Sequence, residues 1–146
     1  MINPTLTVES DIYIHAARGA VWEKFTDLDS WPRWNLSVLA AQWRSGNRWQ
    51  EGATFSIQQQ SRWGERVRLA VIRMVVPDDT TVWESGGGGQ QTVHSAHLTD
   101  DLGGCKIRLR ETYHGPWVFA LYLGRGQQRA RLETALREFK AYIERR

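Results

Sequence analysis

A histidine and a glutamate on two successive predicted strands are the residues of this sequence best placed to do chemistry. His94 has the same parity as Leu98 along its strand, and Glu111 has the same parity as Ile107. Because side chains two residues apart share a face of a strand, we expect the imidazole and the carboxylate to point into one apolar interior. A carboxylate beside an imidazole fixes its tautomer and raises its pKa. The pair therefore predicts a catalytic general base with its partner, a polar anchor for a ligand, or a satisfied buried pair.

Aromatic side chains supply candidates for the wall around this polar pair. The chain has 8 tryptophans in 146 residues. A tryptophan buries a large area and carries one N–H, so it suits both a core and a pocket for an aromatic or polycyclic ligand. Besides His94 and Glu111, the predicted ligand-binding residues are those expected at inward or helix-facing positions: Trp34, Phe55, Trp83, Trp117 and Leu121.

Hydrophobic periodicity predicts the elements that would position these side chains. Apolar residues alternate over residues 6–14, which indicates a half-buried strand. Helical spacing over 18–27 predicts a helix, and a second short helix or turn follows over 29–35. Six more strands, separated by turn residues, are predicted over 37–44, 53–60, 65–76, 80–85, 90–99 and 105–114. Consecutive strands with short connections give an antiparallel meander.

The remaining residues, 117–146, predict one long helix. Its apolar face includes Leu132 and Phe139, and Arg131 lies off that face. Gly124 predicts a kink or a frayed turn in the first half. One long helix must cover the apolar face of the sheet, so we expect an α+β fold in which a curved sheet wraps around the helix. The gap between them is the predicted pocket.

Length and composition describe a single globular domain over residues 1–146. Hydrophobic residues make up 41% of the chain, and the formal net charge of +3 is scattered, which does not indicate nucleic-acid binding. Cys105 is the only cysteine, so an internal disulfide is excluded. No set of His, Cys, Asp and Glu has the spacing of a metal site, and we expect neither a metal nor a cofactor.

The N-terminal residues lack the basic and apolar regions of a secretory signal. No apolar stretch approaches the roughly 18 residues that a membrane span requires. We therefore expect a cytoplasmic protein without stable membrane insertion, either a monomer or a homodimer.

Several short motifs occur along the chain in a characteristic order. They are Ile12-x-Ile14, Val21-Trp22-x-x-Phe25-x-Asp27, Trp31-Pro32-x-Trp34-Asn35, Gly52-x-x-Phe55, Trp83-Glu84, Val93-His94-Ser95 and Glu111-x-x-x-Gly115. Together they resemble the START-like helix-grip superfamily, also called SRPBCC, which includes polyketide cyclases/dehydratases and lipid-transfer proteins. The resemblance covers about residues 5–144 and implies a helix-grip fold with an internal site for a hydrophobic ligand. Because this superfamily has many activities, the fold alone does not define the function.

Three functions are compatible with these observations. We favour a protein that binds a small hydrophobic molecule of aromatic, polyketide-like or lipid-like character. The first alternative is a cyclase/dehydratase enzyme, in which His94 or Glu111 transfers protons to a substrate held away from water. The second is a protein-interaction module like the chaperone-activating relatives, which requires an exposed apolar patch. A pocket with His94 and Glu111 at its floor favours the first two functions, and a filled core with surface tryptophans favours the third.

Overall fold

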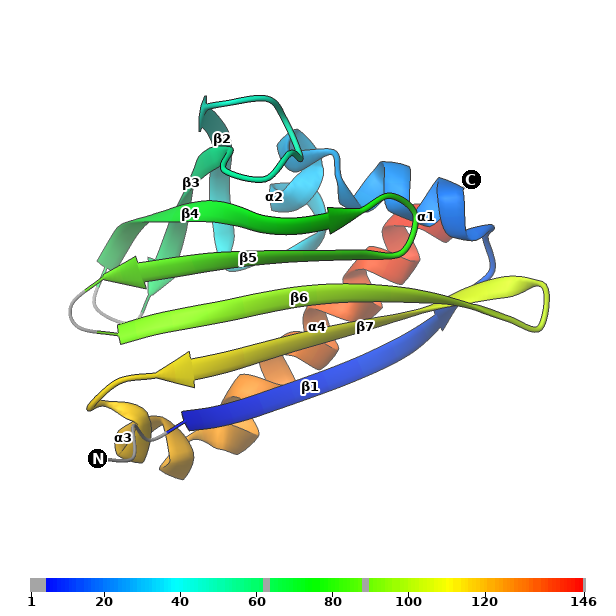
Figure 1. Ribbon diagram of the computed structural model, residues 1–146. Helices are drawn as coiled ribbons and strands as arrows, with labels where there is room; N and C mark the ends of the chain where they lie inside the picture. Colours follow the sequence, from blue (N-terminus) through cyan, green and yellow to red (C-terminus); the bar gives the residue numbers. More distant parts are fainter. Residues whose placement is uncertain (1–4, 62–63, 88–89, 146) are drawn as a thin grey trace.

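The computed structural model describes residues 5–61, 64–87 and 90–145 (Figure 1). The strands are β1 (Thr5–Ile14), β2 (Val38–Ser45), β3 (Thr54–Ser61), β4 (Gly64–Val76), β5 (Thr80–Gly87), β6 (Gln90–Asp101) and β7 (Gly104–His114). The helices are α1 (Arg18–Phe25), the short 3-10 helix η1 (Leu28–Ser30), α2 (Trp31–Trp34), α3 (Val118–Leu123) and α4 (Arg125–Glu144).

Within the described residues the strands form one 7-stranded antiparallel sheet in the order β1-β7-β6-β5-β4-β3-β2. Strands β2 to β7 follow one another as a meander, and β1 pairs with β7 at the other edge. Figure 1 shows the sheet curving around α4, which runs diagonally across its concave face. This arrangement confirms the predicted α+β helix-grip fold, including the short helices after the first strand.

The C-terminal helical region is divided in two, where the sequence predicted one helix from Trp117 with a weak first half. Gly124 ends α3 and is followed at once by α4. Trp117 is not helical but is the residue before α3, with φ −83° and ψ 1°. The side of α4 that faces the sheet buries Leu132 and Phe139, as its apolar spacing predicts.

Aromatic side chains fill the end of the grip where α1, η1 and α2 cover the sheet. The ring of Phe25 lies 5.8 Å from Phe139 of α4 and 6.0 Å from Trp83 of β5. Trp31 donates its indole N–H to the carbonyl of Phe25 at 2.8 Å, which fixes α2 against α1. Ser30 donates its hydroxyl to the carbonyl of Asp27 at 2.7 Å and closes the turn between these helices. The tryptophans of this region therefore belong to the hydrophobic core, and any cavity must lie beside them.

Candidate functional site

Three neighbouring strands place Trp83, His94 and Glu111 in one row on the inner face of the sheet. Trp83 of β5 is the Cα partner of His94 in β6, and His94 is in turn the partner of Glu111 in β7. Ala96 and Leu109, each two residues from a member of the row, are also buried. The alternation of side chains in a strand then requires the row to face inward. The structure thus brings His94 and Glu111 together.

His94 is held on three sides. Its Nδ1 lies 3.5 Å from Oε2 of Glu111, and its Nε2 forms a 2.9 Å hydrogen bond with Oγ of Ser85. The ring of Trp83 stacks on the imidazole with a centroid separation of 5.2 Å and an angle of 2° between the planes. Burial lowers the pKa of His94 to about 4 and outweighs the opposite effect of Glu111. His94 is therefore neutral at pH 7, and the raised pKa expected from the sequence is wrong, because desolvation exceeds the attraction of the carboxylate.

Glu111 is a buried, charged carboxylate with several donors around it. Arg131 donates from Nη2 to Oε1 at 3.1 Å, and the Tyr113 hydroxyl lies 3.1 Å from Oε2. Burial by itself raises the pKa of a carboxyl, but Arg131, His94 and these hydrogen bonds outweigh it and lower the pKa of Glu111. Arg131 of α4 and Tyr113 of β7 thus stabilise the charged form of Glu111, and for this reason its carboxylate is a weak base.

Arg131 and Gln128 complete the polar cluster from α4. Nη2 of Arg131 lies 3.0 Å from Oε1 of Gln128 and 3.1 Å from the Tyr113 hydroxyl. The sequence places Arg131 off the apolar face of the helix, so its role at the site was missed. The long aliphatic part of an arginine lets the guanidinium reach around from the flank of the helix. Arg131 directly precedes the buried Leu132, and this proximity to the apolar face is the signal that could have identified it.

A small cavity lies between this polar cluster and the aromatic core. Its volume is about 70 Å³, and its walls include Trp34, Trp83, His94, Glu111 and Arg131. An apolar cavity that accommodates a benzene ring has a volume of roughly 150 Å³. The enclosed space alone is consequently too small for an aromatic ligand.

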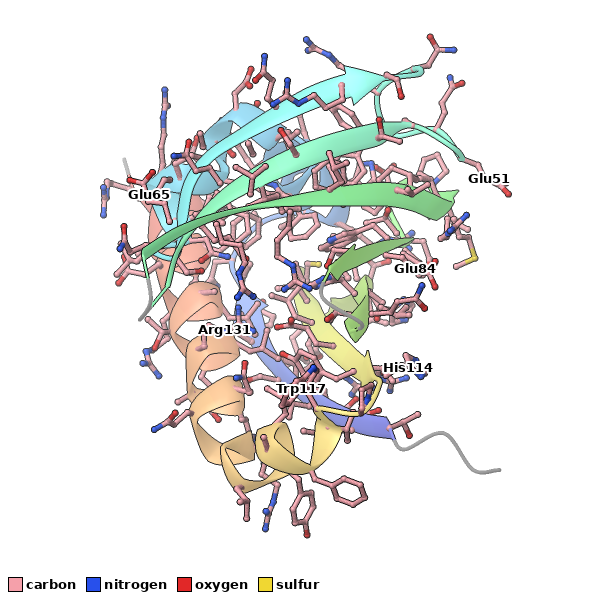
Figure 2. The ribbon with its side chains drawn as sticks, turned by 90° about the vertical axis from the view of Figure 1, so that its left-hand side faces the viewer. Glu51, Glu65, Glu84, His114, Trp117 and Arg131 are labelled. Atoms are coloured by element: carbon pink, nitrogen blue, oxygen red, sulfur yellow. The ribbon has the colours of Figure 1, made fainter. Side chains whose placement is uncertain are left out.

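A larger groove adjoins the cavity at the edge between α4 and the segment that leads into β2. Its volume is about 550 Å³, and Leu36, Ala130 and Thr134 contribute to it. Three residues, Asn35, Arg131 and Ala135, line both the groove and the cavity. Figure 2 shows Arg131 on the side of α4 that faces the strands. The two spaces share these residues, and their combined volume lies in the range of roughly 300–1,000 Å³ typical of ligand pockets.

The remaining predicted wall residues lie at different depths. Trp34 and Trp83 line the cavity together with the polar pair. Phe55 is fully buried in the aromatic core, with its ring 5.7 Å from that of Trp31. Trp117 exposes 61% of its surface, and Leu121 of α3 is half-buried against the core. Phe55, Trp117 and Leu121 do not line the cavity. Trp117 and Leu121 precede Gly124, which separates α3 from α4.

Among the described residues, no group of three or more His, Cys, Asp and Glu side chains is arranged to hold a metal ion. Within the same residues, no helix is both long enough and apolar enough to cross a membrane.

The fold and the position of the pocket define a START-like helix-grip domain. Residues 5–144 match the family described as polyketide cyclase / dehydrase and lipid transport, and the chain belongs to this family. A comparison with curated proteins finds no match.

Solved structures with the same fold include proteins of different kinds. The structure of SA2116 from Staphylococcus aureus, a protein of unknown function, has a TM-score of 0.79 at 15% identity and covers 97% of this chain and 95% of its own. Ara h 8.0201 has a TM-score of 0.71 at 14% identity, with coverage of 96% and 98%. The di-domain ARO/CYC StfQ of the steffimycin biosynthetic pathway has a TM-score of 0.76 at 16% identity, and the match covers 96% of this chain but 51% of that one. At these identities the likeness establishes the fold.

Proposed function

We propose that this protein binds a small hydrophobic molecule between the sheet and α4, with the polar cluster orienting one end of it. The observation that carries the proposal is the common wall of the cavity and the groove at Asn35, Arg131 and Ala135. The groove provides access and volume, and the cavity provides aromatic surface beside a few fixed polar groups. This combination is typical of ligand sites.

The contacts within the polar cluster favour a role in orienting a ligand over a role in proton transfer. Both ring nitrogens of His94 already have partners, Ser85 and Glu111. A histidine whose pKa is about 4 is a weak base at neutral pH. Glu111 is stabilised in its charged form by Arg131, which lowers its basicity as well. A cyclase or dehydratase reaction would have to disrupt these contacts before either group accepted a proton.

The positions of the tryptophans also argue for ligand binding over a protein-interaction module. Trp31, Trp34 and Trp83 are buried, and among the tryptophans that the structure describes only Trp117 is exposed. An interaction surface built on tryptophan would show several of them outside.

Binding can be tested without knowledge of the natural ligand. Protein purified from its own host is measured by native mass spectrometry for a co-purifying molecule, and purified protein is titrated with the neutral fluorescent probe N-phenyl-1-naphthylamine. We expect saturable binding that weakens in His94→Ala, since His94 lines the cavity. Absence of both a co-purified molecule and probe binding would refute the proposal, and an unchanged affinity and stability in His94→Ala would remove His94 from the site.

A further inference from the structure

The charges around the cavity do not balance. Arg131 and Arg68 are two cations beside one carboxylate, Glu111. His94 is neutral because its pKa is about 4, and burial raises the pKa of Tyr113, which keeps its hydroxyl protonated. Counted over the described residues, the interior therefore carries one positive charge more than its carboxylate compensates.

Arg68 reaches this interior from β4. It has the same parity as Ala70 and Ile72, which are fully buried, and its Cα partner on β3 is Ile57, a wall residue of the cavity. Arg68 itself is half-buried. Among the described residues no side chain or carbonyl is hydrogen-bonded to its guanidinium, and its charge acts on His94 and on Glu111.

Burial, followed by repulsion from Arg66 on the same strand, lowers the pKa of Arg68. The attraction of Glu111 acts in the opposite direction and is smaller. A half-buried guanidinium without a partner is costly, and an anion placed beside it would recover that free energy.

Arg131 also retains donors that no described residue uses. All of its hydrogen bonds to Glu111, Tyr113 and Gln128 start from Nη2. A guanidinium has five N–H donors in a planar fork. The N–H groups on Nη1 and Nε are therefore unused within the described part of the chain, on the residue that separates the cavity from the groove.

A third donor without a partner lies in the same wall. Trp34 is 2% exposed, and its indole N–H has no hydrogen-bond partner among the described residues. Buried N–H groups are normally paired, and an unpaired one destabilises the fold. Unused donors from α2 and α4 thus lie in the wall of the cavity, Arg68 of β4 lies beside the wall residue Ile57, and the groups that these donors lack are acceptors.

We propose that the ligand is an amphipathic carboxylic acid, whose carboxylate accepts hydrogen bonds from the guanidinium of Arg68 and from a free N–H of Arg131 while its apolar body occupies the cavity and the groove. This inference rests on the proposed function and specifies its ligand class. A monoanion matches the single excess charge. A planar carboxylate matches the fork of Arg68, which can donate two parallel hydrogen bonds to it. Arg131 can add a single hydrogen bond from Nη1 or Nε, because both of its two-donor edges include the occupied Nη2.

The experiment compares each acid with its neutral amide of the same shape. Isothermal titration calorimetry measures 2-naphthoate against 2-naphthamide and octanoate against octanamide, so that aromatic and aliphatic bodies are distinguished. We expect the native protein to bind at least one of the acids tenfold or more tighter than its amide. A preference for the naphthyl pair assigns an aromatic body, and a preference for the octanoyl pair assigns an aliphatic one.

Two variants assign this preference to the arginines. Arg68→Gln removes a charge that has no hydrogen-bond partner among the described residues, and Arg131→Lys keeps the charge but removes the N–H groups on Nη1 and Nε. In each variant we expect the preference for the acid, measured as its affinity divided by that of its amide, to fall at least fivefold. Arg73→Gln is the matched control, because Arg73 is exposed on the same strand and pairs with Glu84 on the outside. Circular dichroism and thermal unfolding identify variants that fail to fold.

The possible results separate the two proposals. If the amides bind and the acids bind no more tightly, the carboxylate inference is overturned, and the proposed hydrophobic site is unaffected. A preference that survives in both folded variants also overturns it, since the anion is then held elsewhere. If neither acids nor amides bind, the carboxylate inference fails, and the binding of N-phenyl-1-naphthylamine decides separately whether the hydrophobic site exists.

Discussion

Arg131 of α4 and Glu111 of β7 are joined through one guanidinium nitrogen, with Nη2 at 3.1 Å from Oε1 and 3.3 Å from Oε2. The side chain of Glu111 is 8% exposed and that of Arg131 is 39% exposed. The contact links the long helix to the sheet at the border between the cavity and the groove. The stability of the fold and the proposed recognition of a ligand therefore depend on the same pair of residues.

Removal of the charge on Glu111 should destabilise the fold. Glu111→Gln keeps the shape of the side chain but leaves Arg131 without its counter-charge. Breaking a fully buried pair costs roughly 3–5 kcal/mol, and the partial exposure of Arg131 reduces our expectation to about 2 kcal/mol. Urea unfolding at pH 7 measures the difference. Glu133→Gln is the control, since its pair with Arg129 is exposed and should contribute less than about 0.5 kcal/mol.

The buried His94 should make stability depend on pH. Its pKa falls from an ordinary 6.5 to about 4 in the folded chain, so the unfolded chain takes up the proton first as the pH falls. Stability should be full above about pH 6.5 and decrease by about 2 kcal/mol by pH 5. Urea unfolding of His94→Gln over the same range should show a flatter profile than that of the native protein. Identical profiles in the two proteins would contradict a buried neutral His94.

Two tryptophans of α2 offer a matched comparison of a paired and an unpaired N–H. Trp31 and Trp34 are both buried, but the N–H of Trp31 is bonded to Phe25 and that of Trp34 has no partner among the described residues. Trp31→Phe leaves the carbonyl of Phe25 unpaired, and Trp34→Phe removes an unsatisfied donor. We expect Trp31→Phe to be less stable than Trp34→Phe by about 1–2 kcal/mol, measured by urea unfolding. Equal stabilities would indicate that the Trp34 N–H is paired in solution.

Obstruction of the groove should weaken ligand binding without disturbing the core. Ala130 is exposed on α4 and lines the groove, so Ala130→Trp fills part of it. We expect about tenfold weaker binding of N-phenyl-1-naphthylamine. Ala141→Trp places the same side chain at an exposed position of α4 outside the groove and should bind normally. Equal affinities would show that the ligand reaches its site by another route.

Periodicity was sufficient for most of the fold. The alternation of apolar residues predicted each strand to within two residues at either end, because one buried face per strand is a local requirement. The same parity rule placed His94 and Glu111 on one face, and strand pairing made them neighbours. The prediction for the C-terminal region was less exact, since Gly124 separates two helices where a kink was expected.

The amino-acid sequence by itself determined which side chains face inward, because this depends on the two-residue repeat of a strand and the spacing of a helix. Only the tertiary structure decided what those side chains meet. Arg131 joins Glu111 from α4, Arg68 approaches from β4, and burial keeps His94 neutral where the local pair predicted a raised pKa. The free energy of an ionisable group depends on solvent access and on charges distant in the chain, which no local pattern encodes.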